Sequence, residues 1–561
     1  MAFRTPSPKT AALAALLLGA LYLRFRGLCW GWPGVFDADA PHIVNLAVYF
    51  GSGDLNPHIF KYPTLWPYLL SAVYGAYFIG GLLLGAWNGV AAFGAHFVWH
   101  PADFHVAARI VTASLSTLAV WAVWRSARAA GSDGLWAAAI AAFLPVLVEV
   151  AHTPKADTIL FLFSALAWGA ALKLQRERTV RNAAFSGMWV GLAMSSQYTA
   201  AALALLPVCA CLLVKPEEYN SAYLKQAAKL VLISAASALL MVFMTSPYIF
   251  LARHEFMASM ADMSGELAAV RAAHPRLQVL GALSFNIFFY AGTASAAFLA
   301  ALLGFAAEWR KAAPRALLFA VPCLVHFALL ANHPYGGWMR FLIPALPGLI
   351  ILSGLGAQEL YEKKPSRALA IALAALLLAP GLWRSMAFAR DFSLPDTRLE
   401  AAAWLEHNLP AGTAILLDQE HDSPQLPMSA EQAKSLLERT TAAGHPKKRY
   451  YELMANSHPG GGYKIYRIER SAADLESRPE HVRWSNSARD MVDIKPGLSA
   501  LEAAGIEAVV LSSHGINPER RPEYAAFLEQ LKSRWRLAAK FSPGEKSRGP
   551  ELEIYVRNKG A

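Results

Sequence analysis

The chain is poor in charged residues and in cysteine. Only 16% of its 561 residues are Asp, Glu, Lys or Arg, whereas a soluble globular protein contains about 25%. The same chain has 55% hydrophobic residues and a mean hydropathy of +0.31. This composition excludes an ordinary soluble protein. We expect a polytopic α-helical membrane protein with room for one further domain of ordinary size.

Cysteine is too rare and too badly placed for a disulfide framework outside the membrane. The polar C-terminal part has none, and all four lie in or beside apolar segments: Cys29, Cys209, Cys211 and Cys323. The formal net charge of +11 does not predict nucleic-acid binding, because the basic residues form short runs between apolar segments. That distribution is typical of cytoplasmic loops.

The first apolar run predicts the orientation of the chain. Residues 10–30 follow Arg4 and Lys9 and lack a clean small-residue cleavage site, so we interpret them as a retained membrane helix. Positive residues favour the cytoplasmic side. The long loop 31–104 is therefore expected outside.

The apolar run 64–86 is long enough to span a bilayer, but charge argues against a crossing. If it crossed, the basic runs near residues 125–128, 173–181 and 215–229 would all lie outside. We therefore expect an external helix that packs along the membrane or dips into it.

The remaining apolar runs predict about eleven crossings in all. The region 183–214 is short for two full crossings and has a polar middle, SSQY at 195–198, so we expect two short or tilted helices with a polar apex. The other expected spans are 105–125, 134–151, 157–173, 228–248, 281–307, 315–331, 341–360 and 367–386. The loop 249–280, with His254, Glu255 and Asp262, is either a mobile gate or a plain surface helix.

The last 170 residues or so have soluble composition, so we expect a membrane domain over 1–389 and an external domain over 390–561. Strand patterns alternate with helical ones, which predicts an α/β domain. The expected strands are 413–418, 462–470, 506–513 and 552–557, and the expected helices are 396–410, 429–455 and 521–540.

The stretch 36–62 concentrates the titratable groups of the external loop. It contains Asp37, Asp39, His42, Asp54, His58 and Lys61. Such groups beside a bilayer are costly unless they face water or a ligand, which favours an active site at the outer membrane surface. The alternative is a solvated loop in which Asp37 or Asp39 caps a helix at 41–50.

Several segments together resemble a known family. DADAPH (37–42), GDLNPH (53–58) and FKYPTLWPYLL (60–70) are similar to the first external loop of the bacterial glycosyltransferase family 39-like enzymes of the GT-C fold, relatives of the protein O-mannosyltransferases and the lipid A aminoarabinose transferase. AARIVTASLSTLAV (107–120), AHTPKADTILFLF (151–163), GLAMSSQYTAALALLP (191–207) and RFLIPALPGL (340–349) follow in the family's order. The resemblance covers nearly the whole chain and rests on that order.

The resemblance implies a reaction and a location. A sugar on a polyprenyl-phosphate carrier would pass to a glycan, lipid or protein acceptor with inversion, at the outer face of a bacterial inner membrane. The carrier lipid is a substrate, and no separate cofactor is expected. The reaction needs a carboxylate to deprotonate the acceptor and cations to hold the leaving phosphate.

The family pattern assigns the general base to Asp39, with helix capping as the alternative. The family's following Glu is Ala40 here, and Asp37 is the alternative source of a second carboxylate. Lys61 matches the residue that contacts the lipid phosphate in the aminoarabinose transferase relatives. The alternative for Lys61 is an interfacial lysine that extends to lipid headgroups.

The other predicted substrate-binding residues are His42, His58, Arg109, Lys155, Asp157, Gln197, Tyr198, Tyr335 and Arg340. Arg109 is a phosphate ligand or the ion-pair partner of Asp103 or Asp157. Arg340 is a phosphate clamp or an interfacial anchor. Gln197 stands where the family more often has lysine. His42 and His58 match no common metal-ligand spacing, so no metal is expected.

Two other classes of protein are considered. A flippase or transporter would show interrupted helices in two related halves, and the sequence shows no such symmetry. A non-catalytic lipid- or glycan-binding scaffold is kept open by Ala40.

Overall fold

The computed structural model describes residues 7–273, 275–289, 295–363, 365–418, 421–468, 488–515 and 524–558. It divides into two compact units. The first comprises Met1–Leu28, His42–Tyr74 and Ala108–Arg390, and the second Cys29–Pro41, Gly75–Ala107 and Asp391–Ala561. The second unit therefore contains two segments from the long loop predicted after the first helix, in addition to the C-terminal part.

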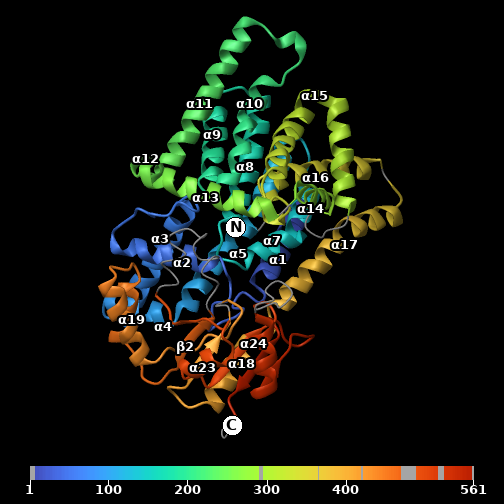
Figure 1. Cartoon of the computed structure of the whole chain (residues 1–561). Helices are drawn as coiled ribbons and strands as arrows, with labels where there is room; N and C mark the ends of the chain where they lie inside the picture. The colour runs from blue at the N-terminus through green and yellow to red at the C-terminus, as the bar shows by residue number, and fades with distance from the viewer. Residues whose placement is uncertain are drawn as a thin grey trace. The chain divides into compact units, whose positions relative to one another are not determined.

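The first unit is built of helices (Figure 1). Seven helices in the described residues are long and apolar enough to cross a membrane: α1 (Pro8–Phe25), α3 (Leu65–Leu83), α5 (Pro101–Ala129), α8 (Asp157–Arg176), α11 (Ser221–Thr245), α15 (Ser295–Ala331) and α17 (Arg367–Asp391). Of these, α3 and α5 pass from one unit into the other. Length and composition alone identify these spans, so the absence of a crossing at 64–86 stays a prediction.

Shorter helices and turns complete the helical set of this unit. They are α2 (Ala40–Tyr49), η1 (Phe50–Ser52), α6 (Leu135–Phe143), α7 (Pro145–Ala151), α9 (Val180–Met194), η2 (Tyr198–Ala204), α10 (Leu205–Leu212), η3 (Pro216–Glu218), α12 (Tyr248–Leu251), α13 (Arg253–Ala273), α14 (Arg276–Phe289), η4 (Met339–Leu342) and α16 (Leu346–Glu362). The short helix α4 (Val90–Trp99) belongs to the second unit. The segment expected as a gate or a surface helix at 249–280 consists, over its described residues, of parts of α12, α13 and α14 with breaks at Ala252 and Pro275.

Breaks in the helices fall within or between several of the predicted crossings. The one at 134–151 divides at Leu144 because Pro145 begins α7, where its missing N–H costs no hydrogen bond. The region 183–214 is interrupted at Ser195–Gln197, as its polar middle predicts. In α15, Ala312 has non-helical backbone angles, which separates the two expected spans on either side.

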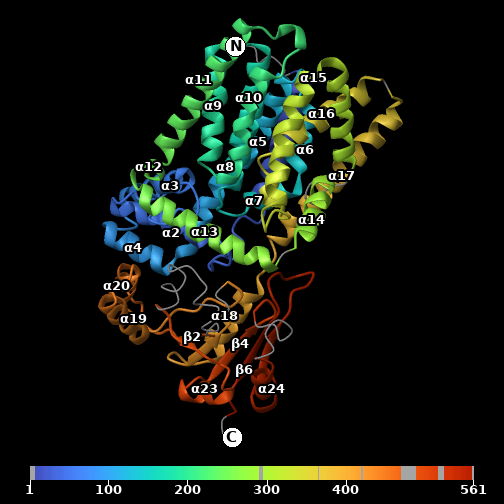
Figure 2. The same ribbon diagram turned by 45° about the horizontal axis from the view of Figure 1, so that its top comes forward.

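Glycine allows close contact between helices in the first unit. A Cβ on Gly187 of α9 would lie 1.9 Å from the carbonyl oxygen of Ser234 in α11, and one on Gly304 of α15 would lie 2.0 Å from that of Leu352 in α16. Figure 2 shows α9 beside α11 and α15 beside α16. Small residues at helix crossings are the usual means of packing inside a membrane.

A buried arginine joins three helices of this unit. The Arg24 side chain in α1 is fully buried. Its guanidinium donates to Ser116 Oγ at 2.7 Å and to the carbonyl oxygens of Ala141 and Ala142 at 3.1 and 3.0 Å. Because the charge is surrounded by acceptors from α5 and α6, Arg24 has a structural role.

The second unit contains a six-stranded mixed sheet in the order β3-β2-β1-β4-β6-β5. The strands are β1 (Ala414–Leu417), β2 (Lys464–Ile468), β3 (Met491–Val492), β4 (Ala508–Ser512), β5 (Arg536–Phe541) and β6 (Leu552–Val556). Pairs among the first four in the sheet are parallel, and β6 is antiparallel to both β4 and β5. The adjoining helices are α18 (Thr397–Asn408), α19 (Ala430–Ala442), α20 (Lys448–Asn456), α23 (Leu498–Ala503) and α24 (Ala525–Arg534).

The predicted fold class, a polytopic helical membrane protein with a C-terminal α/β domain, is confirmed. Two element predictions differ from the structure. The expected helix 429–455 is two helices, α19 ending at Ala442 and α20 beginning at Lys448. The expected helix 521–540 ends at Arg534, and Arg536–Phe541 forms β5. The segment pairs with β6, and this contact overrides local helical preference. Residues 290–294, 469–470 and 521–523 of three predicted elements lie outside the described part.

Candidate functional site

The backbone around Lys61 is fixed on both sides within the first unit. The Phe60 N–H donates to Ser259 Oγ at 3.2 Å, and the Tyr198 hydroxyl donates to the Phe60 carbonyl at 3.3 Å. On the other side, the Thr64 N–H donates to Ser246 Oγ at 3.1 Å. Lys61 itself is exposed. A solvent-exposed cation therefore stands on an anchored loop.

His58 connects the same loop to α13 through two carboxylates. Its Nε2 lies 2.9 Å from Asp54 Oδ2 and its Nδ1 2.9 Å from Glu255 Oε2. Asn56 Nδ2 also donates to both carboxylate oxygens of Glu255, at 3.2 and 3.1 Å. Phe60 packs edge-on against Phe256, with ring centroids 5.6 Å apart. The predicted ligand His58 thus belongs to a polar cluster with Asp54, Asn56 and Glu255 that joins the loop to α13.

The pKa values of Asp54 and His58 reflect the interactions within this cluster. Hydrogen bonds from His58 and Tyr49 lower the pKa of Asp54 to about 2. Partial burial opposes charging of His58, but hydrogen bonds and attraction from Asp54 and Glu255 prevail and raise its pKa. The arrangement therefore favours a charged imidazolium between two carboxylates.

Two of the predicted residues contact each other at the broken helix. Gln197 Nε2 donates to Asp157 Oδ1 at 2.9 Å, and both side chains are buried. Asp157 begins α8, where a negative side chain is favoured by the helix dipole. Gln197 directly precedes η2. The first residue of η2, Tyr198, is the one whose hydroxyl donates to the Phe60 carbonyl.

The turn before α8 is tied to the same region. The Trp66 indole N–H donates to the Pro154 carbonyl at 3.0 Å, which places the start of α3 against the turn that carries Lys155. Lys155 is half-buried. The structure therefore brings the segments carrying Lys61, Lys155 and Tyr198 to one side of the first unit.

His42 joins this group through Tyr62. The His42 and Tyr62 rings have centroids 6.3 Å apart. His42 lies in α2, and Tyr62 follows Lys61 directly. The contact places one predicted ligand beside the neighbour of another.

Arg109 lies inside α5. It is 2% exposed, and its Nη1 donates to the Leu28 carbonyl at 3.3 Å. One helical turn further, Thr112 Oγ1 donates to the Ala151 carbonyl at 2.8 Å. These bonds connect α5 with Leu28, which follows α1, and with α7.

Arg340 and Tyr335 lie among aromatic rings. The Arg340 guanidinium is 5.9 Å from the Trp338 ring centroid and 5.4 Å from that of Phe341, and Tyr335 is 5.0 Å from Trp338. The η4 turn that holds Arg340 packs against α7. Arg340 is half-buried, in keeping with either a phosphate ligand or an interfacial anchor.

Asp37 and Asp39 belong to the second unit and have different surroundings. Asp37 Oδ1 accepts hydrogen bonds from the backbone N–H groups of Asp39 and Ala40, at 3.0 and 3.1 Å, and Asp37 is 8% exposed. Asp37 is therefore the residue that caps α2. Asp39 is half-buried.

Within the described residues, no three His, Cys, Asp or Glu side chains are placed to hold a metal ion together. The positioning contacts of Ser246, Ser259 and Trp66 were not predicted. No sequence signal distinguishes these side chains from ordinary helix residues, because their partners come from distant parts of the chain.

Residues 102–250 match the family model for dolichyl-phosphate-mannose-protein mannosyltransferase. The resemblance to this family, stated above from motif order, is thereby confirmed. No curated protein sequence matches the chain.

Solved structures give weaker similarities. The archaeal oligosaccharyltransferase AglB from Archaeoglobus fulgidus has 13% identity and a TM-score of 0.48, over 98% of this chain and 74% of that chain. ArnT from Cupriavidus metallidurans in the apo state has 13% identity and a TM-score of 0.46, over 98% of each chain. The arabinofuranosyltransferase AftD from Mycobacteria has 16% identity and a TM-score of 0.42, over 97% and 41%.

Proposed function

We propose, from the family match over residues 102–250, that the protein is an inverting membrane glycosyltransferase. It takes a sugar from a polyprenyl-phosphate donor and transfers it to an acceptor at the outer face of the bacterial inner membrane. The observation that carries this proposal is the anchored loop around Lys61. A cation on a fixed backbone can stabilise charge that develops on the leaving phosphate without reorganisation at the moment of reaction.

In this mechanism Asp39 is the general base. The donor sugar's anomeric carbon is attacked by the acceptor's nucleophilic atom, whose proton passes to the Asp39 carboxylate. The carbon–oxygen bond to the carrier phosphate breaks at the same time. Asp37 accepts hydrogen bonds from two backbone N–H groups, and the family pattern assigns the chemical role to Asp39.

The leaving phosphate needs positive charge. We assign it to Lys61, with Arg340 as the second cation, because a guanidinium can bind phosphate through two parallel hydrogen bonds. Tyr198 supports the loop at Phe60, and Gln197 supplies no charge at a position where the family more often has lysine.

The test of the base is Asp39→Asn, assayed with a polyprenyl-phosphate sugar in membranes. We expect transfer to fall by about 10²–10⁴-fold while carrier binding and the thermal unfolding midpoint remain. Asp37→Asn is the matched control, since asparagine caps a helix about as well as aspartate and both stability and transfer should be retained. A folded Asp39→Asn protein at full activity would exclude Asp39 and favour a scaffold or another carboxylate.

The test of the cations is carrier binding. Lys61→Ala and Arg340→Ala should each weaken binding of polyprenyl phosphate by about tenfold or more, as expected when a charge-assisted hydrogen bond worth about 1.5–3 kcal/mol is lost. Lys225, which is also exposed in the first unit, provides the control substitution to alanine. Equal affinity of the Lys61 and Lys225 variants would remove Lys61 from the site.

A further inference from the structure

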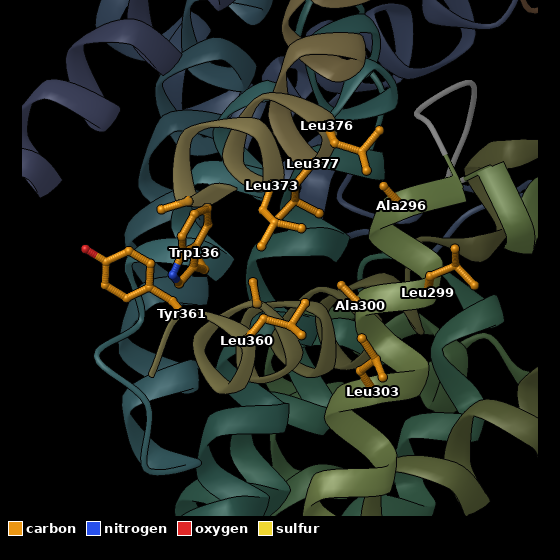
Figure 3. A pocket seen from close by; sticks show the side chains of 12 residues that line it. Trp136, Ala296, Leu299, Ala300, Leu303, Leu360, Tyr361, Leu373, Leu376 and Leu377 are labelled. Carbon is orange, nitrogen blue, oxygen red and sulfur yellow. The ribbon is translucent and has the colours of Figure 1, made fainter. Parts of the chain in front are cut away.

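The first unit contains an apolar cavity that the proposed reaction does not use. It has a volume of about 240 Å³, and side chains of α6, α15, α16 and α17 line it. Figure 3 shows leucines of α15 and α17 facing into it from different sides, with Trp136 and Tyr361 together at one margin. Apart from those two aromatic residues, its lining consists of alanine and leucine.

The cavity lies far along α16 from the predicted phosphate ligands. Arg340 precedes the start of α16 at Leu346, whereas the lining residue Leu360 lies near the end of that helix. Fourteen residues of helix, the difference between 360 and 346, span about 21 Å. A headgroup held at Arg340 is therefore at the other end of α16 from this cavity.

Basic residues stand at the cavity end of the helices. Lys363 directly follows the end of α16 at Glu362, three residues after the lining residue Leu360. Arg367 begins α17 and precedes the lining residue Ala370 by three, a spacing that places neighbours on the same helix face. Both side chains are exposed. The nearby acids are engaged: Glu359 pairs with Lys311 at 2.9 Å, and Glu362 accepts a hydrogen bond from Gln358 at 2.6 Å.

The aromatic pair indicates a membrane surface at the same end. The Trp136 and Tyr361 rings have centroids 6.2 Å apart and cross at 61°. Trp and Tyr concentrate where acyl chains meet headgroups, because each ring has an apolar body and a polar edge. An apolar cavity, interfacial rings and exposed cations thus follow one another in the order of a lipid's tail, neck and headgroup.

We infer that this cavity holds an acyl chain of an anionic phospholipid, whose phosphate lies near Lys363 and Arg367. The volume suits a stretch of one hydrocarbon chain and not a long isoprenoid. Exposed cations beside a hydrophobic surface select anionic over zwitterionic headgroups. The site is separate from the donor site of the proposed function.

Native mass spectrometry of the full chain can test this, with phosphatidylglycerol, phosphatidylethanolamine of the same acyl chains, and a polyprenyl phosphate as probes. We expect phosphatidylglycerol to bind at least tenfold more tightly than phosphatidylethanolamine. Leu373→Trp, which fills the cavity, and the double variant Lys363→Gln with Arg367→Gln should each remove most of this preference. Leu369→Trp is the control, because Leu369 is 51% exposed on the same helix and does not line the cavity.

Three outcomes would overturn the inference. They are equal binding of the two phospholipids, equal behaviour of the Leu373→Trp and Leu369→Trp proteins, or displacement of phosphatidylglycerol by polyprenyl phosphate in a manner that Leu373→Trp abolishes. The last would assign the cavity to the carrier tail. Because the readout is lipid binding and not sugar transfer, each of these results leaves the test of Asp39 unaffected.

Discussion

The two units hold their elements together by different means. In the first, helices approach through glycine and alanine, and Gly187 lies almost in contact with the backbone of Ser234. In the second, large apolar side chains form the core: Leu416 of β1 belongs to one buried cluster with Phe527 and Leu531 of α24. Lipid tails remove the hydrophobic gain of helix association, whereas burial from water drives the packing of a sheet. The packing of the first unit is therefore suited to lipid, and that of the second unit to water.

The largest expected effect is in the sheet. Leu416→Ala should lower the free energy of unfolding of the second unit by about 2–5 kcal/mol, because it opens a cavity at a fully buried position. Leu537→Ala is the control, since Leu537 is 47% exposed in β5. Denaturant titration followed by hydrogen exchange of the β1 and β4 peptides measures both. Equal losses for the two variants would mean that the core does not stabilise this unit.

A polar contact in the first unit gives the next effect. Gln197→Leu removes a donor from the buried Asp157 carboxylate and should cost about 1.5–3 kcal/mol. Gln197→Lys, which restores the residue type more frequent in the family, should recover most of that loss. Thermal unfolding in lipid nanodiscs measures the change. A Gln197→Leu protein as stable as the parent would show that apolar packing alone sustains the broken helix.

The helix contact itself is tested by adding one methyl group. Gly187→Ala places a Cβ against the Ser234 carbonyl and should destabilise the first unit by about 1–3 kcal/mol. Gly281 in α14 has nothing within 4 Å of the corresponding position, so Gly281→Ala should be neutral or slightly stabilising. If both variants unfold at the same temperature, close approach of α9 and α11 does not contribute to stability.

The smallest effect concerns the ion pairs of His58 with Asp54 and Glu255, because exposed ion pairs contribute little. The raised pKa of His58 means that its bonds to Asp54 and Glu255 stabilise the loop fully below the unfolded value of about 6.5, and that this contribution declines as pH rises through the folded value. On the acid side, the Asp54 contribution is present above its unfolded pKa and is lost as pH falls through about 2. Hydrogen exchange of loop peptides, corrected for intrinsic rate, should rise above pH 6.5 in the parent and not in His58→Gln. A rise of the same size in both would remove His58 as its cause.

Composition predicted the architecture because it reports the solvent of each region. The hydrophobic pattern of a helix or a strand can be recognised within a short window of sequence. For this reason α8, α18 and β4 lie close to the expected ranges. The segment around β5 was mistaken for helix because its partner β6 supplies the deciding contact from elsewhere in the sequence.

The candidate site was less predictable. Motif order selected Asp39, Lys61 and Gln197, and the sequence offered Asp37 or Asp39 as a helix cap, but it did not indicate that Ser259 would hold the loop at Phe60. Such contacts join residues that are far apart in the chain, and no local periodicity encodes them. Arg24 shows the same limit, since an arginine in a membrane helix suggests function until its carbonyl partners are seen.

The position of β6 has a consequence for biosynthesis. This strand lies between β4 and β5, although it is the last of the described strands to be made. Its neighbour β5 pairs with β6 and not with β4, so it has no place in the sheet before residues 552–556 have emerged from the ribosome. Until then the exposed edge of β4 offers unpaired backbone groups to other chains, and a nascent protein stalled before this point would be open to aggregation or to capture by a chaperone.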